Sequence, residues 1–236
     1  KEVFDLHPLT KEDLRQSPTR IKVEEFPKYL FCVFYGIHKN RTVELLEFDY
    51  VLGKRFFISN HLKESPYIND LKKNTDKLTK LFNKGLDFLF HKLLDVEIDN
   101  YFPVLEQIDN QVEELQDDVP KKSNPKFVAK LTRLKRSIVY VKRSAYHQRE
   151  KLSFLAKVEY DVLSEKVIPY FRDIYDHSIK IVDAIDYQRE AIHNINENYM
   201  LSLSNHMNEV IKVLGIIATL PFLLPQYPEF MEQILI

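Results

Sequence analysis

One long heptad pattern in the second half of the sequence constrains the fold more than any other feature. From about residue 160 to residue 220, apolar side chains recur every three or four residues, and no proline interrupts the centre. The predicted seam is Phe171, Ile174, Ser178, Ile181, Ile185, Gln188, Ile192, Ile195 and Tyr199. Such spacing predicts one helix that packs against others with left-handed crossing. About sixty residues at 1.5 Å each would measure roughly 90 Å, which exceeds the diameter of a globule of this size.

A helix of that length would expose its apolar seam to water unless other chains covered it. We therefore expect copies of the chain to associate through this helix. The alternative is a bundle within one domain, in which the helix is bent or broken.

Two shorter helical seams precede the long one. The first is Tyr101, Val104, Leu105, Ile108, Val112 and Leu115, and after prolines 120 and 125 the second is Leu131, Leu134, Ile138, Val141, Ala145, Gln148, Leu152 and Leu155. Residues 95–118 carry many acidic side chains and no basic ones. Residues 121–151 are strongly basic, and Glu150 is their one acidic residue. We interpret the pair as an antiparallel hairpin whose faces attract each other. Nucleic-acid binding by the basic helix is the weaker alternative.

The first third of the sequence predicts a domain that mixes helices and strands. Pro8–Leu14 predicts a short helix, and Ser65-Pro66 predicts the start of another. Aromatic and β-branched residues predict strands over 22–26, 29–38, 42–50 and 56–60, with a hairpin connection over 37–41.

The predicted fold class is therefore α+β. It comprises an N-terminal α/β domain with a mixed sheet, a long antiparallel helical hairpin and a very long stalk helix. We expect these domains over residues 1–82, 83–158 and 159–220, followed by a truncated or atypical tail over 221–236.

Composition argues against several functional classes. The chain has only 4 glycines, too few for a glycine-rich phosphate loop, and no catalytic motif is recognisable. Cys32 is the only cysteine, so no intrachain disulfide is possible, and we expect a reducing compartment and no enzymatic activity. The longest apolar run, Val213 to Leu224, is shorter than the roughly 20 residues of a membrane span.

Four sequence strings resemble the CorA magnesium transporter family. One is Pro169-Tyr170-Phe171-Arg172-Asp173-Ile174-Tyr175-Asp176-His177, and a second runs from Ser204 to Thr219 as SNHMNEVIKVLGIIAT. These two are similar to the family's stalk and inner pore helix. The string that begins His7-Pro8-Leu9 resembles the start of its cytosolic domain, and the one that begins Leu94-Asp95 resembles its first long helix.

The resemblance implies a homopentamer in the cell membrane, with this part of each subunit on the cytoplasmic side. The family's Gly-Met-Asn loop and second span do not follow Thr219, where the sequence reads LPFLLP. We therefore expect a truncated chain that does not conduct ions by itself. The implied function is magnesium sensing and gating, in which Mg²⁺ bound between subunits stabilises the closed state. Co²⁺ or another divalent cation is an alternative ligand. A soluble coiled-coil scaffold or adaptor with an α/β head is the alternative function.

The resemblance also implies site residues. Asp13 and Glu197 match the two acidic positions that hold the regulatory cation between subunits, and Asp173 matches a further acidic position on the stalk. Asn208 would ring the cytosolic mouth of the pore. Ile211 and Leu214 follow it by three and six residues and would form a hydrophobic constriction on the same axis.

Overall fold

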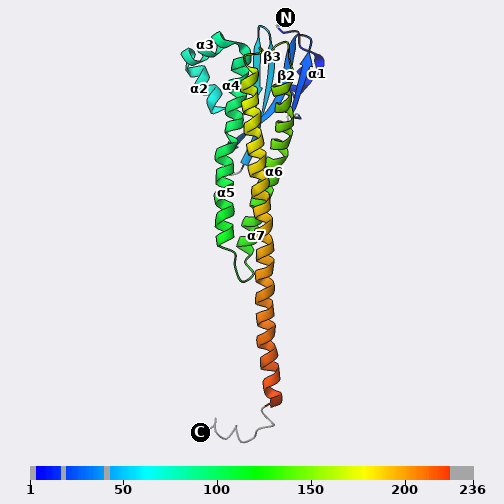
Figure 1. The fold of residues 1–236 in the computed structure, drawn as a ribbon, viewed down its shortest axis with the longest axis vertical. Coiled ribbons are helices and arrows are strands. Elements are labelled where there is room, and N and C mark those ends of the chain that lie inside the picture. Colours follow the sequence, from blue (N-terminus) through cyan, green and yellow to red (C-terminus); the bar gives the residue numbers. More distant parts are fainter. Residues whose placement is uncertain (1–3, 17–19, 40–42, 224–236) are drawn as a thin grey trace. The chain divides into compact units, whose positions relative to one another are not determined.

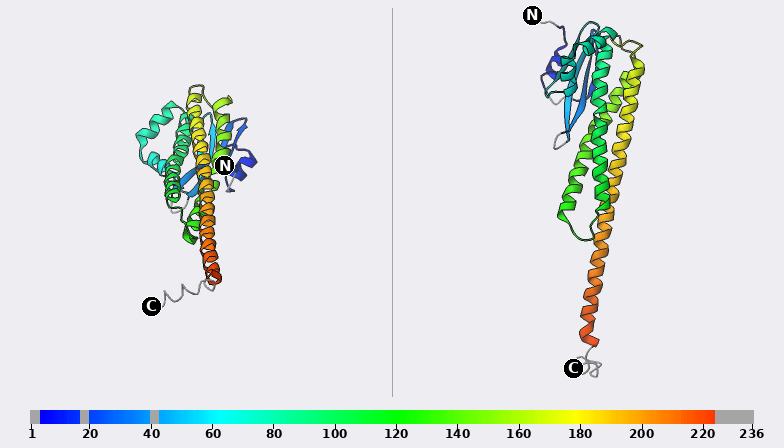
Figure 2. Two further views of the ribbon diagram at one scale, coloured as in Figure 1. Left: turned by 60° about the horizontal axis from the view of Figure 1, so that its bottom comes forward. Right: turned by 90° about the vertical axis from the view of Figure 1, so that its left-hand side faces the viewer.

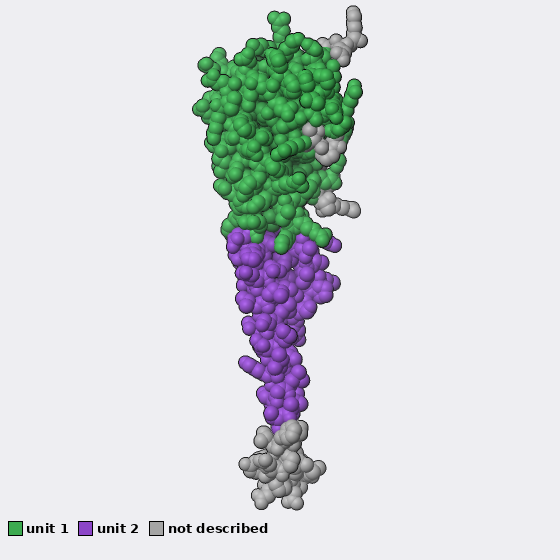
Figure 3. Space-filling view, turned by 90° about the vertical axis from the view of Figure 1, so that its right-hand side faces the viewer, with its two compact units in different colours: residues 1–110, 135–189 green, residues 111–134, 190–236 purple. Residues whose placement is uncertain are grey.

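The computed structural model describes residues 4–16, 20–39 and 43–223, and its elements are drawn in Figure 1. The chain forms two compact units, which Figure 3 colours separately. Unit 1 comprises residues 1–110 and 135–189, and unit 2 comprises residues 111–134 and 190–236. The boundaries between these units fall inside long helices. The predicted segmentation at residues 82, 158 and 220 stays a prediction.

A four-stranded sheet forms part of unit 1. It has the order β1 (Lys22–Phe26), β2 (Tyr29–Lys39), β3 (Val43–Gly53), β4 (Phe57–His61). All three strand pairs are antiparallel, so the predicted mixed sheet was wrong. Short connections return each strand beside the preceding one in the opposite direction, whereas a parallel pair would need a long crossover. The predicted turn over 37–41 falls partly on residues 40–42, which lie outside the described residues.

Both faces of this sheet are covered. On one face Tyr29, Phe31, Val33 and Val51 form a buried cluster against apolar side chains that include Leu14. The helix α1 (Pro8–Asp13) is fixed on this face because Thr10 Oγ1 lies 2.9 Å from the Tyr29 hydroxyl. The right-hand view of Figure 2 shows α1 on one side of the sheet and α4 (Leu86–Asp99) on the other.

The opposite face of the sheet packs on α4 through aromatic rings. The Tyr50 and Phe90 ring centroids are 5.3 Å apart. Gly36 is also on this face, and a Cβ at that position would lie 2.3 Å from the buried carboxylate of Glu97. A side chain at position 36 would therefore displace α4, and this is the reason for a glycine in the middle of a strand.

The remaining helices are α2 (Pro66–Lys73), α3 (Thr75–Lys84), α5 (Tyr101–Asp117), α6 (Pro125–Lys157) and α7 (Ile168–Leu223). Every residue of the three predicted seams is buried, so the seams are confirmed. The helix α7 is continuous over 56 residues, which excludes the alternative of a broken helix. It begins at Ile168 rather than near Tyr160 because residues 161–167 form turns and Pro169 suits a first helical turn.

The α5–α6 hairpin is antiparallel, as the charge pattern suggested. Tyr101 near the start of α5 contacts Gln148 of α6, whereas Glu114 near the end of α5 pairs with Lys130 at 2.6 Å. The basic face of α6 does not pair with α5 alone, because Lys142 forms an ion pair with Asp186 of α7 at 2.7 Å.

The surface of α7 changes within unit 2. Its buried seam ends at Tyr199, and beyond it lie exposed apolar side chains at Val210, Ile211, Val213, Leu214, Ile216 and Ile217. Within the part of the chain that the structure describes, no helix is both long and apolar enough to be a membrane span. The helix continues to residue 223, past the predicted start of the tail at 221, and residues 224–236 lie outside the described residues.

Candidate metal centre

Two adjacent helices of unit 1 bring two acidic side chains and a histidine together. Asp95 on α4 and Asp173 and His177 on α7 each offer a ligand atom, and these atoms all lie within 4.8 Å of one another. Ring contacts hold the two helices side by side, since Phe171 lies 5.5 Å from both Phe90 and His91 between ring centroids. The three groups therefore come from a packed helix pair and not from a loop.

The orientation of His177 is fixed by a carboxylate on the far side of its ring. Its Nδ1 lies 2.8 Å from Asp99 Oδ1, whereas its Nε2 lies 3.9 Å from Asp173 Oδ2. In the neutral imidazole the Nδ1–H group donates a hydrogen bond to the Asp99 carboxylate, which leaves the Nε2 lone pair on the side of Asp173. This carboxylate–histidine arrangement is the usual way in which a metal-binding imidazole is oriented.

The electrostatic surroundings of the cluster favour a bound cation. Burial raises the pKa of Asp99, and the nearby charge of Asp95 raises it further. Burial lowers the pKa of His91, which lies one helical turn from Asp95, and so disfavours a positive charge on this imidazole. The His91 Nε2 atom is buried and has no hydrogen-bond partner among the described residues.

One lysine competes with a metal for this cluster. Lys92 Nζ lies 2.6 Å from Asp95 Oδ2. The second oxygen of Asp95 remains for a ligand, and the ammonium sits on a flexible stem that can move aside. Two carboxylates suit hydrated Mg²⁺, which is held by few protein oxygens and keeps several waters. The imidazole adds affinity for Co²⁺ or another transition metal. The donor set therefore fits a divalent cation.

Of the three predicted metal ligands, only Asp173 belongs to this cluster. Asp13 lies at the end of α1 in unit 1, where it pairs with Lys22. Glu197 lies on α7 in unit 2, where its carboxylate is 3.3 Å from His193 Nε2. The prediction that Asp13 and Glu197 share a cation between subunits is not tested by one chain and stays a prediction.

Sequence reasoning did not assign a ligand role to Asp95 or His177. The available signal was spacing, since Asp95 and Asp99 are four residues apart and so are Asp173 and His177. Side chains four residues apart share a helical face. That spacing could not reveal that the two faces meet.

The three predicted pore residues lie on α7 within unit 2. Asn208, Ile211 and Leu214 are all exposed, and the two apolar side chains are each 59% exposed. Their role in lining a pore stays a prediction.

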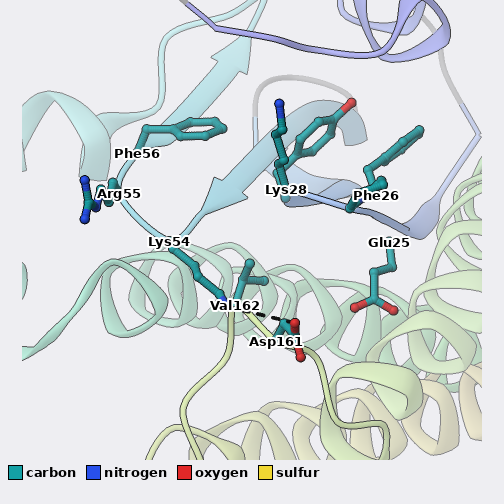
Figure 4. Close-up of a pocket in the computed structure, with 10 residues that line it drawn as sticks. Glu25, Phe26, Lys28, Lys54, Arg55, Phe56, Asp161 and Val162 are labelled. Atoms are coloured by element: carbon teal, nitrogen blue, oxygen red, sulfur yellow. Dashed lines mark ion pairs between the residues drawn. The ribbon is translucent and has the colours of Figure 1, made fainter.

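A separate pocket of about 620 Å³ lies between the tips of two hairpins and the α6–α7 connection (Figure 4). Its charged side chains have both signs. Lys54 reaches Asp161 at 3.9 Å, and Lys28 pairs with Asp5 at 2.7 Å. Both lysines have acidic partners, and Arg55 shares the lining with Glu25, so the charges of this pocket favour neither sign of ligand.

Comparison with known proteins identifies the family. The family model described as CorA-like Mg²⁺ transporter protein matches residues 1–226. The chain belongs to the CorA family. The cobalt/magnesium transport protein CorA of Thermotoga maritima is 32% identical over 228 residues, which cover 93% of this chain and 64% of that protein. The putative metal ion transporter YfjQ of Bacillus subtilis is 26% identical over 220 residues, which cover 93% of this chain and 69% of that protein.

Solved structures confirm the CorA fold. The complete structure of the CorA magnesium transporter from Methanocaldococcus jannaschii aligns with a TM-score of 0.76 at 19% identity, covering 91% of this chain and 68% of that one. The full-length CmaX protein aligns with a TM-score of 0.81 at 19% identity, covering 95% of this chain and 69% of that one. The predicted α+β fold class with a long C-terminal helix is therefore confirmed.

Proposed function

We propose that this chain is the cytosolic, metal-sensing part of a CorA-type divalent-cation transporter. Family membership supports this proposal, as does the name of the Thermotoga maritima relative, a cobalt/magnesium transport protein. The chain spans 64% of that relative's length, and transport is proposed for the whole protein. The proposed location is the cytoplasmic side of the cell membrane.

The observation that carries the metal-sensing proposal is the cluster of Asp95, Asp173 and His177. A cation bound there would join α4 to α7 and would offset the repulsion between two carboxylates. Asp99 would keep the His177 imidazole in the orientation that binds metal. Mg²⁺ would be held largely through its water shell, and Co²⁺ directly by the imidazole.

The proposed switch also involves subunit junctions. Asp13 of one subunit and Glu197 of the next would share a second cation in a closed homopentamer. Without the cation the like charges repel, and the stalk helices are free to move. The cation must bind the closed state more tightly than the open state, since equal binding shifts no population.

The exposed apolar end of α7 supports the assembly proposed here. Five copies placed around an axis would cover part of this surface, and Asn208 would then face the axis. Its side-chain oxygen can accept hydrogen bonds from the water shell of a passing ion. Ile211 and Leu214 would form a narrower apolar ring beyond it.

The first experiment measures cation-dependent thermal stability of the chain and its Asp173→Asn variant. The metal is first removed with a chelator, and then MgCl₂ or CoCl₂ is titrated. A cation present at about 100 times its Kd stabilises the folded state by about 2.7 kcal/mol, which raises the Tm by several degrees. We expect the wild-type Tm to rise in this way and the variant to lose most of the rise.

The matched control for that experiment is Asp183→Asn, an exposed acid on the same helix. It removes the same charge from α7 outside the cluster, so it should keep the full metal response. An equal response in Asp173→Asn and wild type would contradict metal binding at the cluster.

The subunit-junction site is tested separately by limited proteolysis. Replacing both Asp13 and Glu197 with Ala should abolish the protection that Mg²⁺ gives to the assembled protein. Unchanged protection in the double variant would remove these two residues from the site.

A further inference from the structure

A second, positively charged pocket lies in unit 1, away from the metal cluster. Its volume is about 660 Å³, and α6 and the edge of the sheet line it. Three of its lining residues carry or can carry positive charge, namely Arg20, Arg143 and His147. Among the described residues no carboxylate lines it.

The pocket exists because β1 is shorter than its neighbour. The pairing of β1 with β2 ends at Lys22 opposite Val33, so Tyr35 lies two residues beyond the end of this ladder. The side-chain oxygen of Gln148 on α6 accepts a hydrogen bond from the backbone N–H of Tyr35 at 2.8 Å. The helix therefore closes the edge of the sheet, and Arg20 and Ile21 form the rim just before β1.

One face of α6 forms the wall of the pocket. Tyr140, Arg143, Ser144 and His147 follow one another at helical spacing and all line it. Ser144 is anchored below by the buried hydroxyl of Tyr101, with 3.3 Å between the two oxygens. The wall is therefore held by core hydrogen bonds, while the exposed Arg143 and Tyr140 present their side chains at the surface.

The cations of this pocket are not neutralised by close ion pairs among the described residues. Glu150 influences His147 and Arg20 electrostatically, but its own hydrogen-bonded partner is Lys151 at 2.8 Å. The Glu47 carboxylate accepts a hydrogen bond from the Tyr35 hydroxyl at 2.7 Å and is therefore held at the hydroxyl end of the Tyr35 side chain. In the pocket of Figure 4, by contrast, Lys54 pairs with Asp161, and Lys28 pairs with Asp5, which the figure does not draw.

From this geometry we propose that the pocket binds a small phosphorylated ligand with a planar ring, of the nucleotide class. The volume lies within the range of small-molecule sites, roughly 300–1,000 Å³. Two guanidinium groups can each bind a phosphate through a pair of parallel hydrogen bonds. Tyr140 offers an aromatic face for a base, and Ile21 and Leu45 provide the apolar surface that a bare phosphate would not use.

Calorimetric titration of the whole 236-residue chain tests the proposal, with ADP, pyrophosphate and adenosine as separate ligands. Free Mg²⁺ is held constant and in excess, so that chelation by the phosphates cannot imitate binding. We expect ADP to bind more tightly than either pyrophosphate or adenosine. Pyrophosphate that binds as tightly as ADP would overturn the nucleotide assignment, and so would the absence of ADP binding at millimolar concentration.

Variants locate the binding. The double variant Arg20→Gln/Arg143→Gln should weaken ADP binding at least tenfold, and Tyr140→Ala should weaken ADP but leave pyrophosphate unchanged. Arg133→Gln, an exposed arginine on the same helix outside the pocket, is the matched control and should bind as wild type does. Arg143→Lys keeps the charge without the paired donors, so it should bind more weakly than wild type in a folded protein. Unchanged ADP affinity in the double variant would place the ligand elsewhere and overturn the proposal.

The metal response separates this proposal from the proposed function. The double arginine variant should keep its full thermal stabilisation by Mg²⁺, because neither arginine belongs to the Asp95–Asp173–His177 cluster. Asp173→Asn should in turn keep its ADP affinity. Loss of both responses in the double variant would indicate a folding defect, and Arg143→Lys and Tyr140→Ala would then decide the proposal.

Discussion

At the scale of single residues, the chain keeps several charged groups out of water. Asp49 on β3 is 4% exposed, and Glu97 on α4 is 6% exposed. Burial raises the pKa of both carboxyl groups, and that of Asp49 reaches about 6. Asp49 Oδ2 accepts a hydrogen bond from Asn60 at 2.8 Å, but its Oδ1 has no partner among the described residues. An ionised Asp49 is therefore poorly compensated.

We predict that Asp49→Asn stabilises the protein at neutral pH. Because the folded-state pKa is raised, the folded chain holds more protons than the unfolded chain between about pH 4 and pH 6. The free energy of unfolding therefore falls as the pH rises through this window. The variant should gain about 1–3 kcal/mol near pH 7.5 and lose this part of the pH dependence.

Urea unfolding at several pH values between about 4 and 8 measures this effect. Asp183→Asn serves again as the exposed control and should leave the pH profile unchanged. A variant that is no more stable than wild type near pH 7.5 would show that Asp49 is adequately compensated when ionised.

A second prediction at this scale concerns the imidazole of the metal cluster. Asp99→Asn removes the carboxylate that orients His177, while the three proposed ligands remain. We expect Co²⁺ affinity to fall about 10- to 100-fold, as is typical when such an outer carboxylate is lost. Mg²⁺ affinity should change less, because Mg²⁺ depends on the carboxylates and its own waters. Equal losses for both metals, measured by titration, would argue against a direct imidazole–cobalt bond.

At the scale of elements, one tyrosine joins a strand to two helices. The buried Tyr101 hydroxyl of α5 donates to the Tyr35 carbonyl oxygen of β2 at 2.9 Å and accepts from Gln148 Nε2 of α6 at 2.7 Å. Gln148 is the one polar residue in the predicted α6 seam. Its amide oxygen accepts from the Tyr35 N–H and its amide nitrogen donates to Tyr101, which explains how a polar group is tolerated in an apolar seam.

Tyr101→Phe tests this junction. The change leaves Gln148 without a buried acceptor and Tyr35 without a donor, so we expect a loss of about 1–3 kcal/mol in the free energy of unfolding. Tyr187→Phe, at a tyrosine that is 70% exposed, should cost almost nothing by the same measurement. Similar values for the two variants would indicate that water or a rearrangement replaces the lost hydrogen bonds.

At the scale of the whole molecule, the exposed apolar side chains of α7 beyond Tyr199 call for a partner. The proposed partner is a set of further copies of the chain. We predict that Ile211→Asp combined with Leu214→Asp lowers self-association, measured by light scattering over a range of protein concentrations. Charged side chains at these two positions would oppose burial of this exposed apolar surface between chains. Lys212→Gln, at an exposed polar position of the same helix, should have little effect. Identical masses for wild type and the double variant would contradict association through this surface.

Much of the fold could be predicted from local pattern. The three seams, the strands and the start of α2 at Pro66 are all where spacing and residue type placed them. The mixed sheet was wrong, since strand composition does not encode the direction of the neighbour, and α7 begins at Ile168 rather than near Tyr160. The metal cluster was only partly foreseen, because Asp173 was assigned but its partners Asp95 and His177 were not.

The sequence by itself determined where helices run and which face of each is apolar, because a helix places residues three and four apart on one side. It also carried the family resemblance. Only the tertiary structure decided which polar faces meet. The approach of α4 to α7 joins residues nearly eighty positions apart, and the start of β1 only at Lys22 leaves room for a basic pocket beside α6. The metal cluster and the basic pocket both depend on packing between segments that are distant in the sequence, and no local spacing specifies that packing.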